Sequence, residues 1–241
     1  MLSKNNIKLI KSLEHKKYRI QHQLFVVEGQ KSVLEFLKSN FQLEKIFTIK
    51  DDFKTDLADK IEIITEEELK KISFVKTPNQ VLAIFKIPSI KKIEDHNLIL
   101  ALDSINDPGN LGTIIRLCDW FGIEQIICSK DTVDCYNPKV VQSTMGSFTR
   151  VHLIYTDLKE FISSFNGPIY GTFIEGKNIY NIELPKKALV VMGNEANGIS
   201  PEIEKLITQK ISIPAFGKHQ ETESLNVATA TAIILSEFRR R

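Results

Sequence analysis

The sequence predicts an α/β fold in two parts, a C-terminal parallel sheet flanked by helices and a small N-terminal α/β domain. Three observations predict it. From residue 98 onward, short apolar runs alternate with amphipathic helical patterns, which is typical of parallel strands buried on both faces. Residues 88–97 are mostly polar and open with a proline, as linkers do. The 241 residues, 42% of them hydrophobic, suffice for two domains with cores of their own.

The N-terminal part reads as a small α/β domain. The stretch LFVVEGQKSVLEFLKSN reads as a strand, a turn at Glu28-Gly29 and an amphipathic helix, whose apolar side we expect to be Val33, Leu34 and Leu37. Thr65 is the expected N-cap of a second helix over EEELKKI. Further strands are expected over EKIFTI, IEIIT and VLAIFKI.

The C-terminal part alternates strands and helices without an internal repeat. Its strands are expected over LILAL, EQIICS, VHLIY, PIYGTF, ALVVMG and KISIPA. Its helices are expected over LGTIIRLCDWF, PKVVQSTMGSF, DLKEFISSF, SPEIEKLITQ and SLNVATATAIILSEF. We therefore place an N-terminal domain at 1–86, a linker at 87–97 and the main domain at 98–241.

Composition and charge narrow the class of protein. No apolar run approaches the roughly 20 residues that a membrane span needs, and the N-terminus is too polar for a signal peptide, so we expect a cytoplasmic protein. The three cysteines match no zinc motif and the five histidines form no cluster, so we expect no metal. The first 50 residues carry ten basic and four acidic side chains. This excess permits nucleic-acid binding, although a solvated helix face explains the same charges.

The stretch DPGNLGTIIR, residues 107–116, follows a buried strand and leads into a helix. Ligands of open α/β sheets bind at the carboxyl ends of strands, so this turn is well placed for a site. Its glycines, Gly109 and Gly112, match neither the dinucleotide fingerprint nor the Walker loop. Arg116 lies off the apolar stripe of the helix and is free to face a cleft. Asn110 is open to three interpretations, as a turn residue, a helix cap or a ligand contact.

Two later loops have the same placement behind buried strands. In ALVVMGNEANGIS, Gly193 and Gly198 flank Glu195 and let the backbone come close to a ligand. In KISIPAFGKHQETESLNVATATAIILSEF, residues 210–238, we expect a helix to begin at Ser224, with Asn226 at its N-terminus. A helix N-terminus attracts carboxylates and phosphates. For each residue alone, a surface turn or simple capping is the alternative. Together, the three loops would converge on one edge of the sheet and form a composite site.

Three stretches, NDPGNLGTIIR, VMGNEANGIS and ISIP…ESLNV, resemble in order and spacing the signature motifs of the SpoU (TrmH-type) RNA 2′-O-ribose methyltransferases of the SPOUT superfamily. The resemblance covers residues 98–241, and residues 1–86 resemble the RNA substrate-binding domain of rRNA-directed members. It implies a deep trefoil knot in the C-terminal sheet, a ribosomal-protein-like N-terminal fold and a homodimer. It also implies S-adenosyl-L-methionine as cofactor and methyl transfer to a ribose 2′-hydroxyl, which we expect to lie in 23S rRNA.

The resemblance further implies roles for individual residues. Arg116 would contact the target nucleotide and help to activate its 2′-hydroxyl. Because a guanidinium stays protonated, we assign it to holding phosphate and stabilising oxyanion charge. The residues that would position Arg116, the ribose and the cofactor are Asn110, Glu195, Ser224 and Asn226. Backbone groups that would hold the cofactor lie around Thr172, Gly193, Ile213 and Leu225.

Several functions stay open from the sequence. The substrate could be a tRNA, although the N-terminal domain favours rRNA, and a non-catalytic RNA-binding protein could keep the same fold. Base methylation is possible, but ESLNV favours the ribose. A nucleotide-dependent oxidoreductase would need a fingerprint that is absent. The sequence also departs from the family twice. The loop over 217–224 is longer than usual, which could reshape RNA access, and Ala228 stands where many members carry serine, a change that concerns packing.

Overall fold

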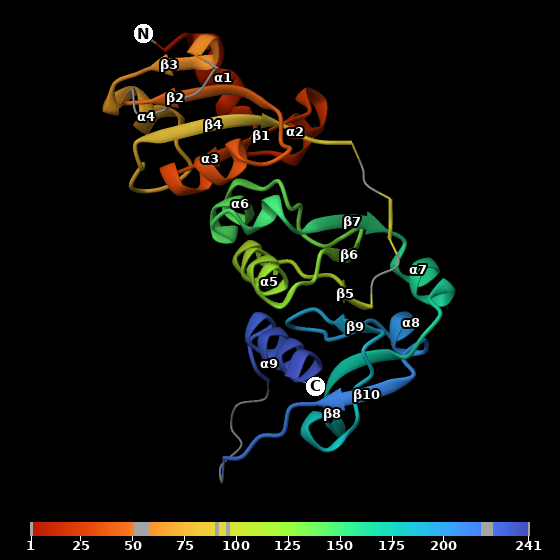
Figure 1. Cartoon of the computed structure of the whole chain (residues 1–241). Coiled ribbons are helices and arrows are strands. Elements are labelled where there is room, and N and C mark those ends of the chain that lie inside the picture. Colours follow the sequence, from red (N-terminus) through yellow and green to blue (C-terminus); the bar gives the residue numbers. More distant parts are fainter. Residues whose placement is uncertain (1, 51–57, 90–91, 95–96, 218–223, 241) are drawn as a thin grey trace. The chain divides into compact units, whose positions relative to one another are not determined.

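The computed structural model describes residues 2–50, 58–89, 92–94, 97–217 and 224–240. The chain forms two compact units, drawn in Figure 1. The first unit comprises residues 1–90 and 134–149, and the second comprises residues 91–133 and 150–241. Residues 134–149 belong to the N-terminal unit although the sequence assigned them to the main domain. The predicted linker over 87–97 includes positions outside the described residues, and the domain boundaries stay a prediction.

The first unit contains a four-stranded sheet in the order β1-β4-β2-β3. Its strands are β1 (Leu24–Glu28), β2 (Leu43–Thr48), β3 (Ile61–Ile63) and β4 (Val81–Lys86). β4 pairs antiparallel with both β1 and β2, whereas β2 and β3 are parallel. All four lie within or overlap the apolar runs that predicted them. The mixed pairing distinguishes this sheet from the all-parallel sheet of the second unit.

The N-terminal segment of the first unit contains the helices α1 (Lys4–Ser12), α2 (Lys16–His22), α3 (Gln30–Leu37) and α4 (Glu66–Ile72), with a short turn η1 (Ala58–Lys60). The expected cap of α4 is confirmed as a capping box, in which Thr65 Oγ1 accepts from the Glu68 amide and the Glu68 carboxylate accepts from the Thr65 amide. The expected apolar side of α3 is wrong in part. Val33 and Phe36 are buried, but Leu34 is 38% exposed, because the buried side follows positions 32, 33 and 36.

Residues 134–149 join the first unit through aromatic packing. They contain α6 (Pro138–Thr144) and the turn η2 (Ser147–Thr149), and α6 packs on β1. Tyr136 and Phe148 lie with ring centroids 5.3 Å apart, and Phe25 of β1 contacts both rings, at 5.0 Å and 6.5 Å. Such ring pairs add to the stabilisation that burial of apolar area provides. The aromatic core therefore depends on two segments that are distant in the sequence.

The second unit contains a six-stranded sheet in the order β10-β8-β9-β5-β6-β7. Its strands are β5 (Leu98–Leu102), β6 (Gln125–Ser129), β7 (His152–Thr156), β8 (Ile169–Asn178), β9 (Ala188–Met192) and β10 (Gln209–Ser212). Every neighbouring pair is parallel. All residues of β5, β6 and β9 are buried, as continuous apolar runs predict for central parallel strands. The predicted parallel sheet is confirmed.

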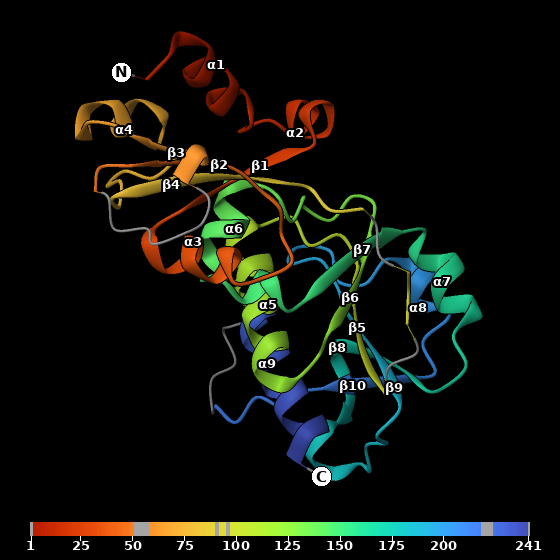
Figure 2. The same ribbon diagram turned by 45° about the horizontal axis from the view of Figure 1, so that its top comes forward.

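Helices cover both faces of this sheet. They are α5 (Pro108–Phe121), α7 (Leu158–Ser164), α8 (Pro201–Glu204) and α9 (Val227–Arg240), with a turn η3 (Ile179–Asn181). Figure 2 shows α5 and α9 side by side on one face and α7 and α8 on the other, in agreement with their contacts. Ile162 of α7 and Ile203 of α8 pack in one core cluster with Leu189 and Val191 of β9. None of the described helices is long and apolar enough to cross a membrane.

Two helices begin at residues other than those expected. α5 begins at Pro108, and Asp107 caps it by accepting a hydrogen bond from the Asn110 amide at 2.8 Å. The sequence DPGNLG is therefore a cap and a first helical turn, not a loop. α9 begins at Val227, not Ser224, because the Asn226 side-chain oxygen accepts from the amides of Ala228 and Thr229 and so satisfies two free N–H groups.

Candidate functional site at the strand ends

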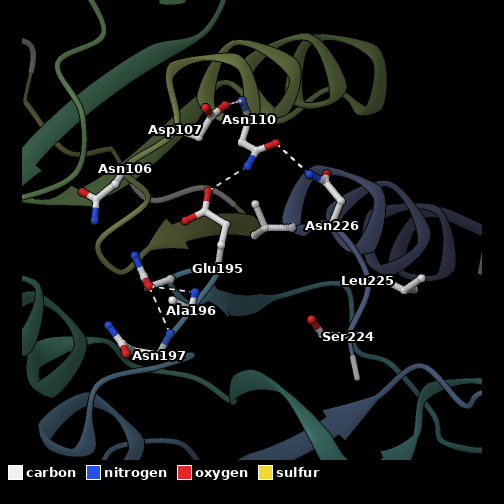
Figure 3. A pocket seen from close by; sticks show the side chains of 11 residues that line it. Asn106, Asp107, Asn110, Glu195, Ala196, Asn197, Ser224, Leu225 and Asn226 are labelled. Atoms are coloured by element: carbon white, nitrogen blue, oxygen red, sulfur yellow. Dashed lines mark hydrogen bonds between the residues drawn. The ribbon is translucent and has the colours of Figure 1, made fainter. Parts of the chain in front are cut away.

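Three segments of the second unit meet around a pocket of about 690 Å³ (Figure 3). One wall consists of Asn106, Asp107 and Asn110, at the start of α5. Residues 194–197, which follow β9, form a second wall, and residues 224–227, which lead into α9, form a third. The expected convergence of the three loops is confirmed. Its cause is the parallel sheet, because segments that follow parallel strands emerge at the same edge.

A chain of hydrogen bonds connects the three walls. Asn110 Nδ2 donates to Glu195 Oε1 at 2.8 Å, and Asn226 Nδ2 donates to Asn110 Oδ1 at 2.9 Å (Figure 3). The Asn226 oxygen is in turn occupied by capping α9. Each amide thus has a defined orientation, since its oxygen accepts and its nitrogen donates. We call Glu195, Asn110 and Asn226 the pocket network.

The loop that carries Glu195 is closed by its own backbone. The amides of Asn194 and Gly198 each donate to the other's carbonyl at 2.9 Å, and the Asn194 side-chain oxygen accepts from the amides of Ala196 and Asn197. A Cβ atom on Gly193 would lie 2.3 Å from the backbone of Gly198. The loop itself therefore requires glycine at position 193, so the absence of a side chain there is explained without a ligand.

A buried carboxylate that the sequence reasoning missed anchors this loop to β5. Asp103 is 4% exposed, and its Oδ2 accepts from the Ser200 amide at 2.7 Å. Beside it, Asn194 Nδ2 donates to the Ser104 carbonyl at 2.7 Å. The signal was present in the sequence, because Asp103 is a charged residue that directly follows five buried apolar positions.

Hydrogen bonds from Ser104 and Ser129 hold the pKa of the neighbouring Asp131 below its ordinary value.

The predicted site residues divide into two groups. Those that line the pocket are Asn110, Glu195, Ser224, Leu225 and Asn226. Arg116, Thr172, Gly193 and Ile213 do not line it. Arg116 lies six residues beyond Asn110 on α5, is exposed, and makes no hydrogen bond or ion pair with the described residues.

Three predicted cofactor residues lie on neighbouring strands. Thr172 lies within β8 and donates through Oγ1 to the Val191 carbonyl at 3.2 Å. Gly193 directly follows β9, and Ile213 directly follows β10 and is half-buried. Since the sheet order is β10-β8-β9, these residues come from adjacent positions in the sheet. Residues 218–223, most of the loop that the sequence identified as longer than usual, lie outside the described residues.

The pocket of the second unit is lined mainly by hydrogen-bonding groups. Within the part of the chain that the structure describes, no three His, Cys, Asp or Glu side chains gather where they could hold a metal ion. The pocket walls instead carry amides, hydroxyls and carboxylates beside the apolar side chain of Leu225, which is half exposed. Pockets with a few convergent polar groups and some apolar wall are typical of small-molecule sites.

Comparisons with known proteins match both halves of the chain. A model of the SpoU rRNA methylase family matches residues 97–236, and a model of the MRM3-like substrate binding domain matches residues 4–83. The chain is 29% identical to the 23S rRNA (guanosine(2553)-2′-O)-methyltransferase RlmP of Bacillus subtilis over 238 residues, which is 95% of this chain and 94% of that protein.

Solved structures agree over the whole chain. A protein from Porphyromonas gingivalis assigned to the TrmH family of RNA methyltransferases is 38% identical, with a TM-score of 0.91 and coverage of 100% of this chain and 99% of that one. The AdoMet-bound rRNA methyltransferase from Sinorhizobium meliloti is 28% identical, with a TM-score of 0.86 and coverage of 100% and 97%.

Proposed function

The chain belongs to the SpoU rRNA methylase family, and we propose that it is an S-adenosyl-L-methionine-dependent methyltransferase acting on a ribose 2′-hydroxyl of 23S rRNA. The relative from Bacillus subtilis, which this chain matches along almost its full length, is named for that reaction on a guanosine. The match includes the N-terminal unit, which corresponds to a substrate binding domain. This full-length correspondence favours rRNA over tRNA as the substrate.

The observation that carries the proposal is the pocket network. Asn110 is 85 residues from Glu195 and 116 residues from Asn226 in the sequence, yet the three side chains form one hydrogen-bonded chain beside the pocket. These are exposed hydrogen bonds, which contribute little to stability because water competes for the same groups. Their value lies in fixing the positions of polar groups toward a ligand, as catalysis by alignment requires.

The residues at the strand ends fit S-adenosyl-L-methionine. Leu225 offers apolar surface in the pocket wall, which suits one face of a purine ring. Backbone groups around Thr172, within β8, and around Gly193 and Ile213, which directly follow β9 and β10, would hold the remainder. When bound, the cofactor supplies a methyl group already activated on a sulfonium, so we expect the reaction to need no metal.

The chain's own residues would align the ribose and stabilise the charge that develops on its oxygen. Arg116 has no partner among the described residues, so its guanidinium is available to a phosphate and to the oxyanion. A guanidinium carries donors only and has no acceptor, so this side chain does not act as the base. The pocket network would hold Asn110 in one orientation toward the ribose, and Ser224 would contribute a hydroxyl from the third wall.

The finer features of the family remain part of the proposal. We propose that the C-terminal sheet is threaded into a deep trefoil knot, that two copies of the chain form a homodimer, and that the protein acts in the cytoplasm. The fold supports the first of these, since the chain aligns in full with solved proteins of the family.

The test is transfer of labelled methyl from S-adenosyl-L-methionine to total rRNA from a strain that lacks this gene, with total tRNA in parallel. We expect label in 23S rRNA and resistance to alkaline cleavage at the modified nucleotide, because a 2′-O-methyl group blocks attack by the 2′-oxygen. Label in tRNA alone would show that the substrate is a tRNA and not 23S rRNA. Binding of cofactor and RNA without transfer to rRNA or ribosomal particles would favour the non-catalytic alternative.

A further inference from the structure

Helix α2 is attached to the first unit by a single buried side chain, and that side chain is an arginine. Arg19 is 2% exposed, whereas the other six residues of this seven-residue helix are exposed. Isolated helices of this length are marginal in water, and most helices in proteins are stabilised by an apolar face. α2 has no such face, so its attachment is polar.

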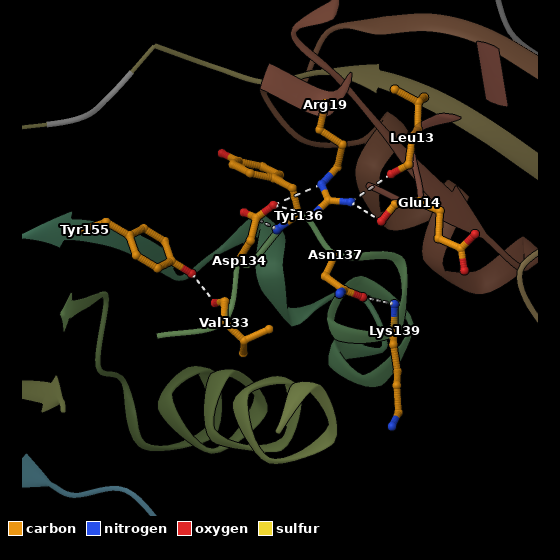
Figure 4. A network of polar contacts seen from close by, with 9 residues as sticks. All are labelled: Leu13, Glu14, Arg19, Val133, Asp134, Tyr136, Asn137, Lys139 and Tyr155. Carbon is orange, nitrogen blue, oxygen red and sulfur yellow. Dashed lines mark hydrogen bonds and ion pairs between the residues drawn. The ribbon is translucent and has the colours of Figure 1, made fainter. Parts of the chain in front are cut away.

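Figure 4 shows how Arg19 holds the corner between α1 and α2. Its Nε and Nη2 donate to Asp134 Oδ2 at 2.9 Å and 2.6 Å, and its Nη1 donates to the carbonyls of Leu13 and Glu14 at 2.8 Å and 2.7 Å. Asp134 Oδ1 accepts from the Tyr136 amide at 3.2 Å. We call Arg19 and Asp134, with these partners, the anchor network. It fixes the orientation of α2 and leaves the rest of the helix surface open.

That open surface carries aromatic rings. His15, the N-cap of α2, and Tyr18 and His22 within it are spaced at i, i+3 and i+7, which places the three rings on one side. The Tyr18 ring centroid lies 6.4 Å from that of His15 and 6.5 Å from that of His22, with the Tyr18 and His22 planes inclined by 20°. Tyr18 is 37% exposed. Exposed rings of this kind can stack on nucleic-acid bases.

The same surface is positively charged. Lys16 and Lys17 are exposed and form no ion pair with the described residues, and Lys17 Nζ lies 5.9 Å from the Tyr18 ring centroid. On α1, Lys4 and Lys8 are likewise exposed and unpaired within the described residues. Glu14 is the one acidic residue between positions 4 and 22. Lysines beside exposed rings match the phosphates and bases of a single strand.

We propose that His15, Lys16, Lys17, Tyr18 and His22, which we call the α2 platform, bind an unpaired segment of the RNA substrate, with a base stacked on Tyr18 and phosphates at the two lysines. The proposal rests on the proposed function, because it takes an RNA as the partner. RNA is favoured over an acidic protein because flat rings and cations occur together on a rigidly held helix. Unpaired bases are the part of an RNA that aromatic side chains can reach.

The test compares full-length variants in two assays. One measures binding of rRNA from the strain that lacks the gene and of a labelled single-stranded oligouridylate, without turnover. The other measures methyl transfer to the same rRNA. We expect Tyr18→Ala to raise both the Kd and the KM for rRNA about tenfold, the size of one lost base stack, with kcat and cofactor affinity unchanged. Tyr18→Phe keeps the ring and should bind as the wild type does.

A second set of variants tests the lysines of the α2 platform separately from Tyr18. Replacing Lys16 and Lys17 together with alanine should reduce the slope of log affinity against log salt by about 1.4 for the oligouridylate, since each phosphate contact of a single strand contributes about 0.7. The matched control is Lys159→Ala, which removes an exposed lysine of α7 and should leave the slope unchanged. Melting temperatures of all variants should equal that of the wild type.

Defined outcomes would overturn the α2 platform. Unchanged rRNA binding by Tyr18→Ala and by the double lysine variant would do so, as would equal losses for Tyr18→Ala and Tyr18→Phe. If these variants bound rRNA normally but lost binding to an acidic protein, the partner would be that protein. Failure of the proposed function would give a different result in the two assays. In that case the wild type binds RNA without methylating it, and the binding assay still decides on the platform.

Discussion

The pocket network and the anchor network are both sets of polar contacts between distant parts of the sequence, but they differ in burial and charge. The pocket network links Glu195, Asn110 and Asn226 at the surface through uncharged amides and one carboxylate. The anchor network places the charged Arg19 at 2% exposure against Asp134, which is 115 residues away. The two units also differ in their arginines. Arg116 of the second unit has no partner among the described residues, whereas Arg19 of the first unit donates hydrogen bonds through all three guanidinium nitrogens.

Burial therefore separates polar residues that serve the chemistry of the site from polar residues that stabilise the fold. Exposed hydrogen bonds exchange readily with water, so their removal changes the free energy of unfolding little. Removal of one partner from a buried ion pair leaves an uncompensated charge and costs several kcal/mol. The two networks should therefore respond to mutation in opposite assays, and each of the following changes tests that expectation.

Arg116→Ala should produce the largest effect on activity. We expect kcat to fall at least about 1,000-fold, equivalent to about 4 kcal/mol, because the group that stabilises the developing negative charge is gone. The free energy of unfolding and the affinity for S-adenosyl-L-methionine should stay unchanged, since Arg116 has no partner among the described residues. Methyl transfer, cofactor titration and denaturant unfolding measure the three quantities. Equal losses of turnover and cofactor affinity would contradict the assignment.

Arg19→Ala should have the largest effect on stability. We expect the free energy of unfolding to fall by about 3 kcal/mol, because the carboxylate of Asp134 and the two carbonyls lose their donor. Urea unfolding followed by circular dichroism measures it, and kcat per folded molecule should be retained. A loss below about 1 kcal/mol would show that the buried pair does not hold α2.

Asn110→Ala should lower activity and leave stability nearly unchanged, the opposite of Arg19→Ala. The pocket network loses its central member, so we expect kcat to fall about 100-fold, or about 2.7 kcal/mol, while the free energy of unfolding changes by less than about 0.5 kcal/mol. The matched control is Asn106→Ala, which also lines the pocket but lies outside the network. If both asparagine variants lost activity equally, the network would have no special role.

Gly193→Ala separates the loop from the carboxylate it carries. The added Cβ would lie 2.3 Å from backbone atoms of Gly198 and Ile199, so we expect the free energy of unfolding to fall by about 2 kcal/mol through displacement of the loop. Thermal melting measures the loss, and turnover should fall with it as Glu195 moves. Unaltered stability would mean that the loop adapts and that Glu195 is not held by backbone closure.

Glu28→Gln should give the smallest change in the free energy of unfolding, and the size of that change depends on pH. Burial raises the pKa of Glu28 above its ordinary value, despite hydrogen bonds from Ser73 and the Phe74 amide. The folded state therefore binds a proton more tightly than the unfolded state, so wild-type stability falls as pH rises from the unfolded pKa, near 4.3, through the folded pKa.

The neutral glutamine lacks this pH dependence. Relative to the wild type, Glu28→Gln should gain stability between pH 4 and pH 7, by less than about 1 kcal/mol. Urea unfolding at both pH values measures the difference. A gap between the two proteins that is the same at pH 4 and pH 7 would contradict the raised pKa.

The features that the sequence predicted well are those encoded locally. Continuous apolar runs predicted β5 and β9, and Thr65 predicted a helix start, because burial on both faces and capping leave marks within a few residues. The meeting of three loops followed from the rule that parallel strands end at one edge. The starts of α5 and α9 were misplaced because Asp107 and Asn226 compete with neighbouring residues that cap equally well.

The features that could not be predicted depend on long-range contacts. Arg19 is one of several basic residues in a polar segment, and nothing near it indicates that it is the one buried against Asp134. Asp103 is visible only as a charge after a buried strand, and its partner, the Ser200 amide, is 97 residues away. Single-sequence reasoning finds which residues are polar at strand ends, whereas the fold decides which are buried.

The membership of residues 134–149 in the first unit has a consequence for the gene. Neither unit is encoded by one continuous stretch, so a single cut at the linker would leave Tyr136 and Phe148 in the catalytic half without the aromatic core that covers them. A protein made from residues 98–241 alone would expose that apolar surface to water. Exchange of the substrate binding domain between relatives must therefore move two gene segments together.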